Sequence, residues 1–289
     1  MVFHPPVAIV AKAADAGKYK TGLPAWNMLL RGLMAGSYIA MGGALATVCS
    51  TGVAAFLGAG FAKLILGAVF PVGLIMIVLT GAELFTGDAM LAPMAAFIHK
   101  ISWVSVLNLW VWVYIGNLIG SLLFAYIMAY GPLVGFDAAG AATVNAFGLA
   151  AVNIAIGKVS YVGLVAQWSL FLKAIACNWL VNLAVLLGIC ADDLIGKFFG
   201  IWFPIMAFVS TGFEHCVANM YFIPTGIMVS GMLSPEQIAD IGAKLANLSW
   251  VTMWTNNVIM ATIGNIVGGL FFVGVVYWVA FRKEIAALK

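Results

Sequence analysis

A short polar stretch inside a long apolar one is the most unusual feature of this sequence. Residues 211–219 read TGFEHCVAN and place an acid, Glu214, beside an imidazole, His215, within a hydrophobic run. An ionisable side chain at the centre of a membrane span costs about 2.5–3.5 kcal/mol on insertion scales, so such residues usually serve a function. Histidine changes charge most readily near neutral pH. His215 is therefore a candidate for attracting an anion or passing it a proton; the alternative is a structural histidine that bridges a helix break.

A second stretch of the same kind lies earlier in the chain. Residues 80–88 read TGAELFTGD, and the threonine, glycine and acid of TGxE recur at the same offsets, with Asp88 opposite Asn219. Two interrupted hydrophobic segments in corresponding halves of a membrane protein predict a permeation site near the midplane. Helix starts facing that site suit a small anion. We expect the Thr86 hydroxyl to bind His215 or substrate, and Glu83 and Asp88 to cap the half-helices.

Two further polar residues are assigned supporting roles. Asn178 lies deep in the apolar segment 167–189 and is predicted to bind the second polar stretch, or else to join two spans by a hydrogen bond. Adjacent helical residues point about 100° apart. We therefore expect Glu214 to face backbone amides or Asn178, in a structural or pKa-tuning role, while His215 faces the pore.

The composition excludes a soluble globular protein. Hydrophobic residues make up 64% of the 289 residues and charged residues only 8%, with a mean hydropathy of +1.11. A soluble domain has about 25% charged residues, so the sequence predicts an all-α polytopic membrane protein. Basic residues are scattered, which excludes a nucleic-acid-binding stripe. The cysteines show no metal-like spacing, so we expect reduced thiols, no metal and no cofactor.

The order of the apolar segments predicts the domain organisation. Residues 1–25 form an amphipathic helix that either lies on the membrane surface or covers the pore, and residues 26–285 form a six-span channel domain. The GNxxG motif of residues 116–120 recurs at 264–268, so we divide the channel into repeats covering about 26–130 and 161–281. Three spans per repeat give an inverted 3+3 arrangement with spans two and five broken. Positive residues then place both termini in the cytoplasm.

Four separated motifs resemble the formate/nitrite transporter family, most closely its formate members. They are GAELFTG at 81–87, CNWLVNLAV at 177–185, GFEHCVANMYFIP at 212–224 and TIGNIVGG at 262–269. The resemblance implies a homopentamer of aquaporin-like protomers in the cell membrane, each with its own pore. It further implies that Thr86, Asn178 and His215 line or support the pore centre, and that apolar constrictions are formed by Phe70, Leu74, Leu84, Val181 and Phe208.

The outer vestibule of the family carries a lysine, and two residues compete for that place. Lys158 begins a KVS segment similar to the family's, whereas Lys173 corresponds to Arg31 in the first repeat. We expect one of them, not both, to supply the positive charge that attracts anions. The predicted function is a formate channel or transporter with possible proton coupling; nitrite, hydrosulfide, acetate and lactate stay open as substrates. Outside transport, an integral-membrane enzyme is the alternative, and a structural subunit would not explain two interrupted spans.

Overall fold

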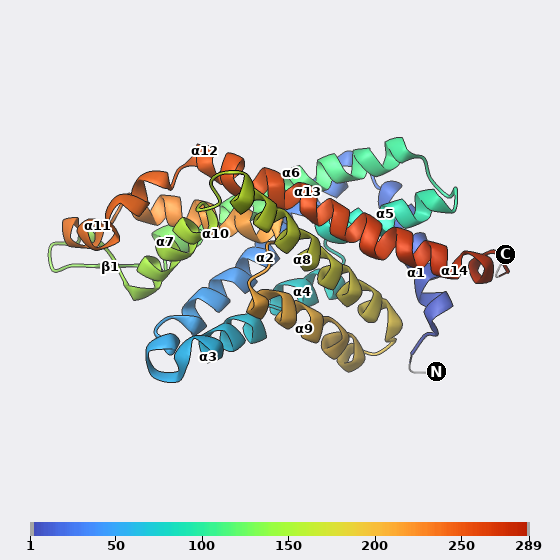
Figure 1. Cartoon of the computed structure of the whole chain (residues 1–289), viewed down its shortest axis with the longest axis horizontal. Helices are drawn as coiled ribbons and strands as arrows, with labels where there is room; N and C mark the ends of the chain where they lie inside the picture. The colour runs from blue at the N-terminus through green and yellow to red at the C-terminus, as the bar shows by residue number, and fades with distance from the viewer. Residues whose placement is uncertain (1–2, 288–289) are drawn as a thin grey trace.

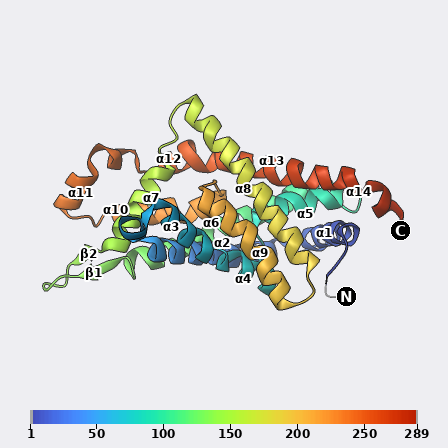
Figure 2. The same cartoon turned by 60° about the horizontal axis from the view of Figure 1, so that its bottom comes forward.

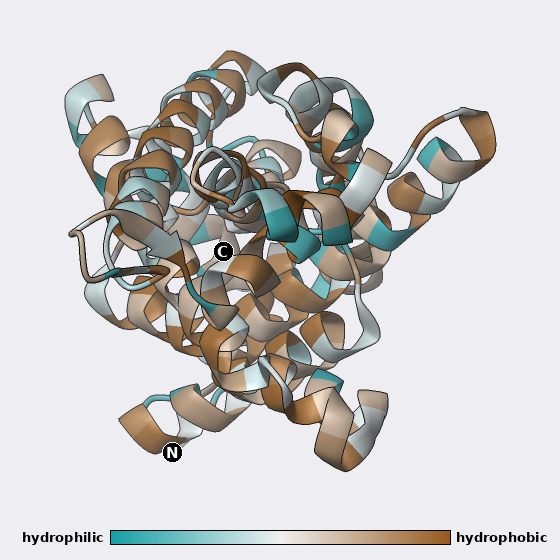
Figure 3. Ribbon diagram, turned by 90° about the vertical axis from the view of Figure 1, so that its left-hand side faces the viewer, coloured by the Kyte–Doolittle hydropathy of each residue, from teal (hydrophilic) through white to brown (hydrophobic). Residues whose placement is uncertain are grey.

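The computed structural model describes residues 3–287 as a bundle of long helices (Figure 1). Most of the helical ribbon is hydrophobic, with hydrophilic residues in short patches (Figure 3). Both ends of the chain lie at one end of the molecule, called here the termini side, and the opposite end is called the far side. Within the described residues, six helical segments are long and apolar enough to cross a membrane: Ala25–Ser50, Val53–Thr80, Trp103–Tyr130, Leu164–Cys190, Leu194–Thr211 and Trp250–Ile285. The prediction of an all-α, six-span membrane protein is confirmed.

The first part of the chain packs its helices through small residues. A Cβ on Gly36 would approach the Asn117 carbonyl oxygen to 2.1 Å, and one on Gly120 would approach the Leu33 oxygen to 2.0 Å. Only glycine allows two helix backbones to come this close. The elements are α1 (Pro6–Thr21), α2 (Ala25–Ser50), α3 (Val53–Val69), α4 (Val72–Thr80), α5 (Phe85–Phe97) and α6 (Trp103–Tyr130), and the close contact joins α2 to α6.

The second part contains a hairpin and irregular helical turns in addition to its spans. Its elements are β1 (Val134–Phe136), β2 (Ala142–Val144), α7 (Ala146–Lys158), α8 (Leu164–Cys190), α9 (Leu194–Thr211), α10 (Cys216–Ser230), α11 (Pro235–Ile241), the 3₁₀ helix η1 (Gly242–Asn247), α12 (Trp250–Met253), the π-helix η2 (Trp254–Val258), α13 (Ile259–Val267), the π-helix η3 (Gly268–Val275) and α14 (Val276–Ala287). The antiparallel β1–β2 hairpin protrudes on the far side (Figures 1 and 2).

Two glycines turn the chain inside the apolar part of the molecule. Gly81 follows the last residue of α4 and Gly212 that of α9, as their C-caps, with φ angles of +78° and +76°. Glycine adopts this left-handed conformation at no steric cost and commonly ends helices in this way. The chain then runs extended through Leu84 and His215 before α5 and α10 begin. Helix α3 begins at Val53 and bends at Gly58.

Helix α1 is docked beneath the spans on the termini side. Its buried face includes Val10, Ala13 and Gly17 and packs against α5. A Cβ on Gly17 would meet the Leu91 carbonyl oxygen at 2.0 Å, so this contact is backbone to backbone. Ahead of the helix, the His4 ring lies 2.6 Å from the Asp192 carboxylate. The N-terminal helix therefore rests on protein. Residues 1–2 of the segment expected to form it lie outside the described residues.

Candidate functional site

Three cavities follow one another between the two sides of the molecule. The far cavity has a volume of about 340 Å³, the near cavity, on the termini side, about 250 Å³, and the central cavity about 10 Å³. The far and central cavities share Phe70, Phe208 and His215. The central and near cavities share Leu74 and Leu84. The shared walls make one path, and its centre has room for roughly a single water molecule.

The narrow centre of this path is almost entirely apolar. All five residues expected at the constrictions line the central cavity together with Ile39, Ile205 and His215. The rings of Phe70 and Phe208 meet edge to face with centroids 5.9 Å apart, and Val181 is 1% exposed. An anion passing here loses its hydration, and an ion in a low-dielectric setting carries a penalty of several kcal/mol.

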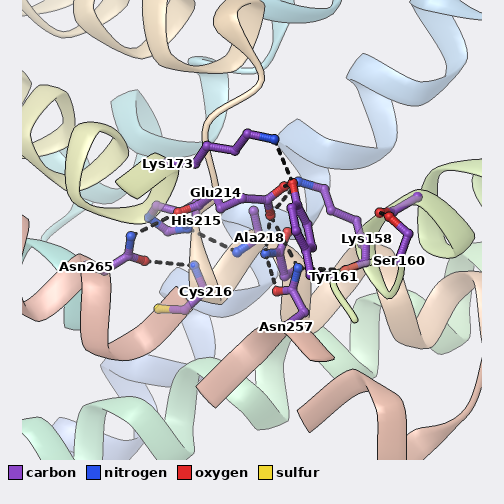
Figure 4. Close-up of polar contacts among 12 residues, drawn as sticks. Lys158, Ser160, Tyr161, Lys173, Glu214, His215, Cys216, Ala218, Asn257 and Asn265 are labelled. Atoms are coloured by element: carbon purple, nitrogen blue, oxygen red, sulfur yellow. Dashed lines mark hydrogen bonds and ion pairs between the residues drawn. The ribbon is translucent and has the colours of Figure 1, made fainter. Parts of the chain in front are cut away.

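His215 and Thr86 join the two interrupted segments. The His215 Nε2 atom lies 2.9 Å from the Thr86 hydroxyl oxygen, and its Nδ1 accepts the Ala218 backbone N–H at 3.0 Å, which caps α10 (Figure 4). Because Nδ1 is an acceptor, the neutral ring carries its hydrogen on Nε2 and donates it to Thr86. The hydroxyl hydrogen of Thr86 is then available to another acceptor. A proton on Nδ1 would break the helix cap, so this geometry belongs to a neutral imidazole.

Asn178 supports the first interrupted segment and not the second. Its amide nitrogen donates to the carbonyl oxygens of Thr86, at 3.0 Å, and Asn265, at 2.6 Å. The neighbouring amide of Asn182 donates to the same Thr86 oxygen at 3.1 Å. The prediction of a hydrogen bond from Asn178 to the second polar stretch is wrong. Helix α8 passes beside α5 at this level, and the sequence does not reveal that proximity.

Asn117 and Asn265 perform the same task in the two halves of the chain. The Asn117 side-chain oxygen accepts the Phe85 N–H at 2.9 Å, and that of Asn265 accepts the Cys216 N–H at 2.8 Å. Each thus satisfies an N–H at the start of a half-helix that has no partner within that helix. Their amide nitrogens donate to the carbonyls of Glu83 and Glu214, both at 2.9 Å. The recurring GNxxG motif marked these residues, but the motif alone does not place them at the site.

Glu214 is the centre of a polar cluster on the far side. It is 3% exposed and accepts from the Lys158 ammonium at 2.9 Å and the Asn219 amide at 2.8 Å. Its other oxygen accepts from the Tyr161 hydroxyl at 3.0 Å, and Lys173 donates to that hydroxyl at 3.1 Å (Figure 4). Burial and the Glu214 charge raise the pKa of Tyr161, so the phenol stays a donor. The expectation that Glu214 faces backbone amides or Asn178 is wrong.

Helix α1 completes the corresponding cluster on the termini side. The Lys20 ammonium contacts the carboxylates of Glu83 and Asp88, the latter at 2.9 Å, and Arg31 lies 3.6 Å from Glu83. Burial alone would lower the pKa of Lys20, but Asp88 and Glu83 outweigh it and raise this pKa. The capping role expected for the two acids is wrong, because the α5 N-cap, Leu84, makes no side-chain cap bond. From the sequence alone, Lys20 is only one of the positive residues that place both termini in the cytoplasm.

Both competing lysines line the far cavity. Lys158 reaches it from the end of α7 and Lys173 from α8, and Lys63 of α3 joins them. The near cavity is lined by Lys20, Arg31 and Lys197. Within residues 3–287, no group of three or more histidine, cysteine, aspartate or glutamate side chains is arranged to hold a metal ion.

Comparison with known proteins identifies the family. The model of the formate/nitrite transporter family matches residues 7–279. The chain belongs to this family. It is 43% identical, over 96% of its length and 97% of the relative's, to a probable formate transporter of Methanothermobacter thermautotrophicus. It is 35% identical to the formate channel BtFdhC of Bacillus thuringiensis over the full length of both. A solved pentameric formate channel with formate bound matches with a TM-score of 0.74 and 35% identity, covering 90% of this chain and 98% of that one.

Proposed function

We propose that this protein carries formate across the membrane through the far, central and near cavities. The observation that supports this most directly is the shared walls of the three cavities, which form one path with a narrow apolar centre lined by His215, the hydrogen-bond partner of Thr86. Similar proteins named as formate channels supply the substrate class. Membership of a transporter family argues against an integral-membrane enzyme.

The geometry suggests how the anion and a proton would meet. Cations at both mouths attract formate, and the apolar centre favours its neutral acid over the charged form. Thr86 accepts a hydrogen bond from His215 and so turns its own hydroxyl hydrogen toward an incoming oxygen. If His215 is to deliver a proton, it must first gain one at Nδ1, which releases the Ala218 N–H. Proton delivery would thus be coupled to loosening of the first turn of α10.

We further propose the arrangement of the protein in the cell membrane. Excess positive charge on the termini side puts both chain ends in the cytoplasm. Five copies would assemble, as in the pentameric relative, since apolar residues such as Phe56, Leu164 and Val165 are 86% to 91% exposed and need lipid or protein neighbours. A stable monomer or trimer in native mass spectrometry would contradict this. Helix α1, which lines the near cavity through Tyr19 and Lys20, would act as a cytoplasmic lid.

Flux of labelled formate into proteoliposomes tests the proposed function. We expect uptake well above that of protein-free vesicles. Unlabelled nitrite, hydrosulfide, acetate and lactate, added in turn as competitors, rank the substrates that the fold admits. Uptake no faster than in empty vesicles would contradict formate transport, and stronger competition by nitrite than by formate itself would assign the chain to nitrite.

A further inference from the structure

Lys63 reaches the far cavity from α3, whereas Lys158 and Lys173 reach it from α7 and α8. It is an exposed residue of α3 and lines the cavity together with Lys158 and Lys173. Its ammonium nitrogen lies 3.6 Å from the position that a Cβ on Gly212 would take. Gly212 is the turn that leads to Glu214 and His215. The positive charge of Lys63 therefore lies beside the turn that precedes Glu214 and His215.

The three lysines of the far cavity differ in how their charges are neutralised. Lys158 is paired with the buried carboxylate of Glu214 at 2.9 Å. Lys173 donates to the neutral Tyr161 hydroxyl and lies 5.0 Å from the centre of its ring. Within residues 3–287, neither Lys63 nor Lys173 has a carboxylate within 4.0 Å. Three lysines and one glutamate line the cavity, so its formal charge is positive by two.

The end of α9 explains why Lys63 stays at this place. Helix α9 ends at Thr211, and a helix C-terminus carries a partial negative charge that attracts cations. A partial charge of this kind positions the ammonium without cancelling it. Lys63 is thus held at the rim of the cavity. Most of its positive charge stays uncompensated and can attract an anion that enters.

We propose that Lys63, acting with Lys173, supplies the positive charge that captures the substrate anion at the far cavity, whereas the Lys158 charge is balanced by Glu214. This inference rests on the proposed transport function. Charges at a cavity mouth raise the local concentration of an oppositely charged ligand and speed its entry, and salt screens them. Lys63 should accordingly affect uptake at low formate concentration and leave the flux at saturating formate unchanged.

The test compares Lys63→Gln with Lys63→Arg and with Lys244→Gln. Lys244 is an exposed lysine of η1 that does not line the cavity, so its loss changes the net charge equally. Formate flux into proteoliposomes is measured at low and saturating formate, each at low and high salt. We expect Lys63→Gln to lower uptake several-fold at low formate and low salt, and to match wild type at saturation or high salt. Lys63→Arg and Lys244→Gln should behave as wild type.

Each other outcome overturns the inference. Wild-type uptake by Lys63→Gln at low formate and low salt would show that Lys63 does not capture anions. An equal loss at every formate and salt concentration would assign Lys63 to the structure of the α9 end. If Lys244→Gln lowered formate uptake by the same factor, the effect would come from the net charge of the protein and not from the position of Lys63. A wild-type protein that carries no formate would refute the proposed function, and the role of Lys63 in capture would fall with it.

Discussion

At the residue scale, the hydrogen bonds of His215 define what it can do. One ring nitrogen caps α10 and the other holds Thr86, so the imidazole joins the two interrupted segments. This arrangement needs a neutral ring, and a second proton would have to displace the Ala218 N–H. The resting His215 is thus a donor to Thr86, and any cationic His215 belongs to a different, transient geometry.

The variant His215→Asn tests this role. Asparagine is a good N-cap residue, so we expect the start of α10 to survive while the titratable group is lost. Formate flux should lose its dependence on external pH, and the variant should either stop transport or pass the bare anion with a measurable current. The check is flux and current over a pH series in both proteins. A wild-type pH profile with the same charge moved per formate would make His215 a polar pore residue only.

Lys158→Gln should affect stability much more than Lys63→Gln does. It leaves the Glu214 carboxylate, which is 3% exposed, without its cation. Removing one partner of a buried ion pair costs about 3–5 kcal/mol, and we expect the lower part of that range because the Lys158 side chain is 20% exposed. Thermal unfolding in detergent measures the difference. Equal midpoints for the two variants would show that the Lys158–Glu214 pair is not needed for stability.

The sequence predicted the site residues better than it predicted their partners. His215 and Thr86 were found because each stands out locally, as a polar group in an apolar run, whereas the constriction residues followed only from the family resemblance. The partners of Glu214 were missed because Lys158 and Tyr161 come from α7 and the following loop, more than fifty positions earlier. Such contacts depend on tertiary packing, to which the sequence pattern gives no access.

At the element scale, the two glycine turns set the geometry of the path. Among residues 3–287, no atom beyond its chain neighbours lies within 4 Å of a Cβ placed on Gly81, so Gly81→Ala adds only backbone strain. A left-handed conformation costs other residues about 1–2 kcal/mol. Gly60 is the control, because its Cβ site is equally open and it lies within α3 at a conformation that alanine accepts. Gly60→Ala should be neutral or stabilising by up to about 1 kcal/mol. A higher thermal unfolding midpoint for Gly81→Ala than for Gly60→Ala would contradict the left-handed role of Gly81.

Helix α1 depends on Lys20 for its docking. Lys20→Met should release the helix, because the buried Asp88 loses its partner cation and Glu83 is left with the more distant Arg31, at 3.6 Å, whereas Lys18→Met removes an exposed charge of the same helix. Hydrogen exchange of residues 6–21 should become faster in the first variant only. The raised pKa of Lys20 stabilises the docked state below the ordinary lysine pKa, and this contribution is lost only as the pH rises through the raised value. Equal exchange rates of residues 6–21 in the two variants would contradict this assignment.

Some elements could not be predicted from the sequence. Interruptions were predicted only in spans two and five, but the regular α-helix of the last span is also interrupted, by the π-helical turns η2 and η3. In η2, Asn257 donates to the Lys158 carbonyl oxygen at 2.8 Å and accepts from the Asn219 amide at 2.6 Å. A π-turn realigns side chains and is frequent at functional sites. The π-turn η2 is stabilised by partners on α7 and α10, which lie close to it only in the folded protein.

At the scale of the whole molecule, the two mouths of the path are built alike but charged differently. Each has a buried glutamate paired with a lysine, Glu83 with Lys20 and Glu214 with Lys158. Asp88 adds a second carboxylate on the termini side, where the far side has Asn219. The number of spans and the family could be predicted from composition and motifs, because these are local properties of the sequence. Which lysines are neutralised by a carboxylate could not be predicted, because it depends on the positions of α1, α3 and α7 in the folded protein.

Phe208→Leu is the sharpest test of a formate path through the central cavity, because its readout is a gain of lactate transport that a misfolded protein cannot mimic. Phe208 closes the central cavity against Phe70, and leucine removes part of that wall. In proteoliposomes, we expect wild type to carry formate much faster than lactate, and Phe208→Leu to raise the ratio of lactate to formate flux several-fold. An unchanged ratio in the folded variant, or wild-type formate flux no higher than in empty vesicles, would contradict a formate path through this cavity.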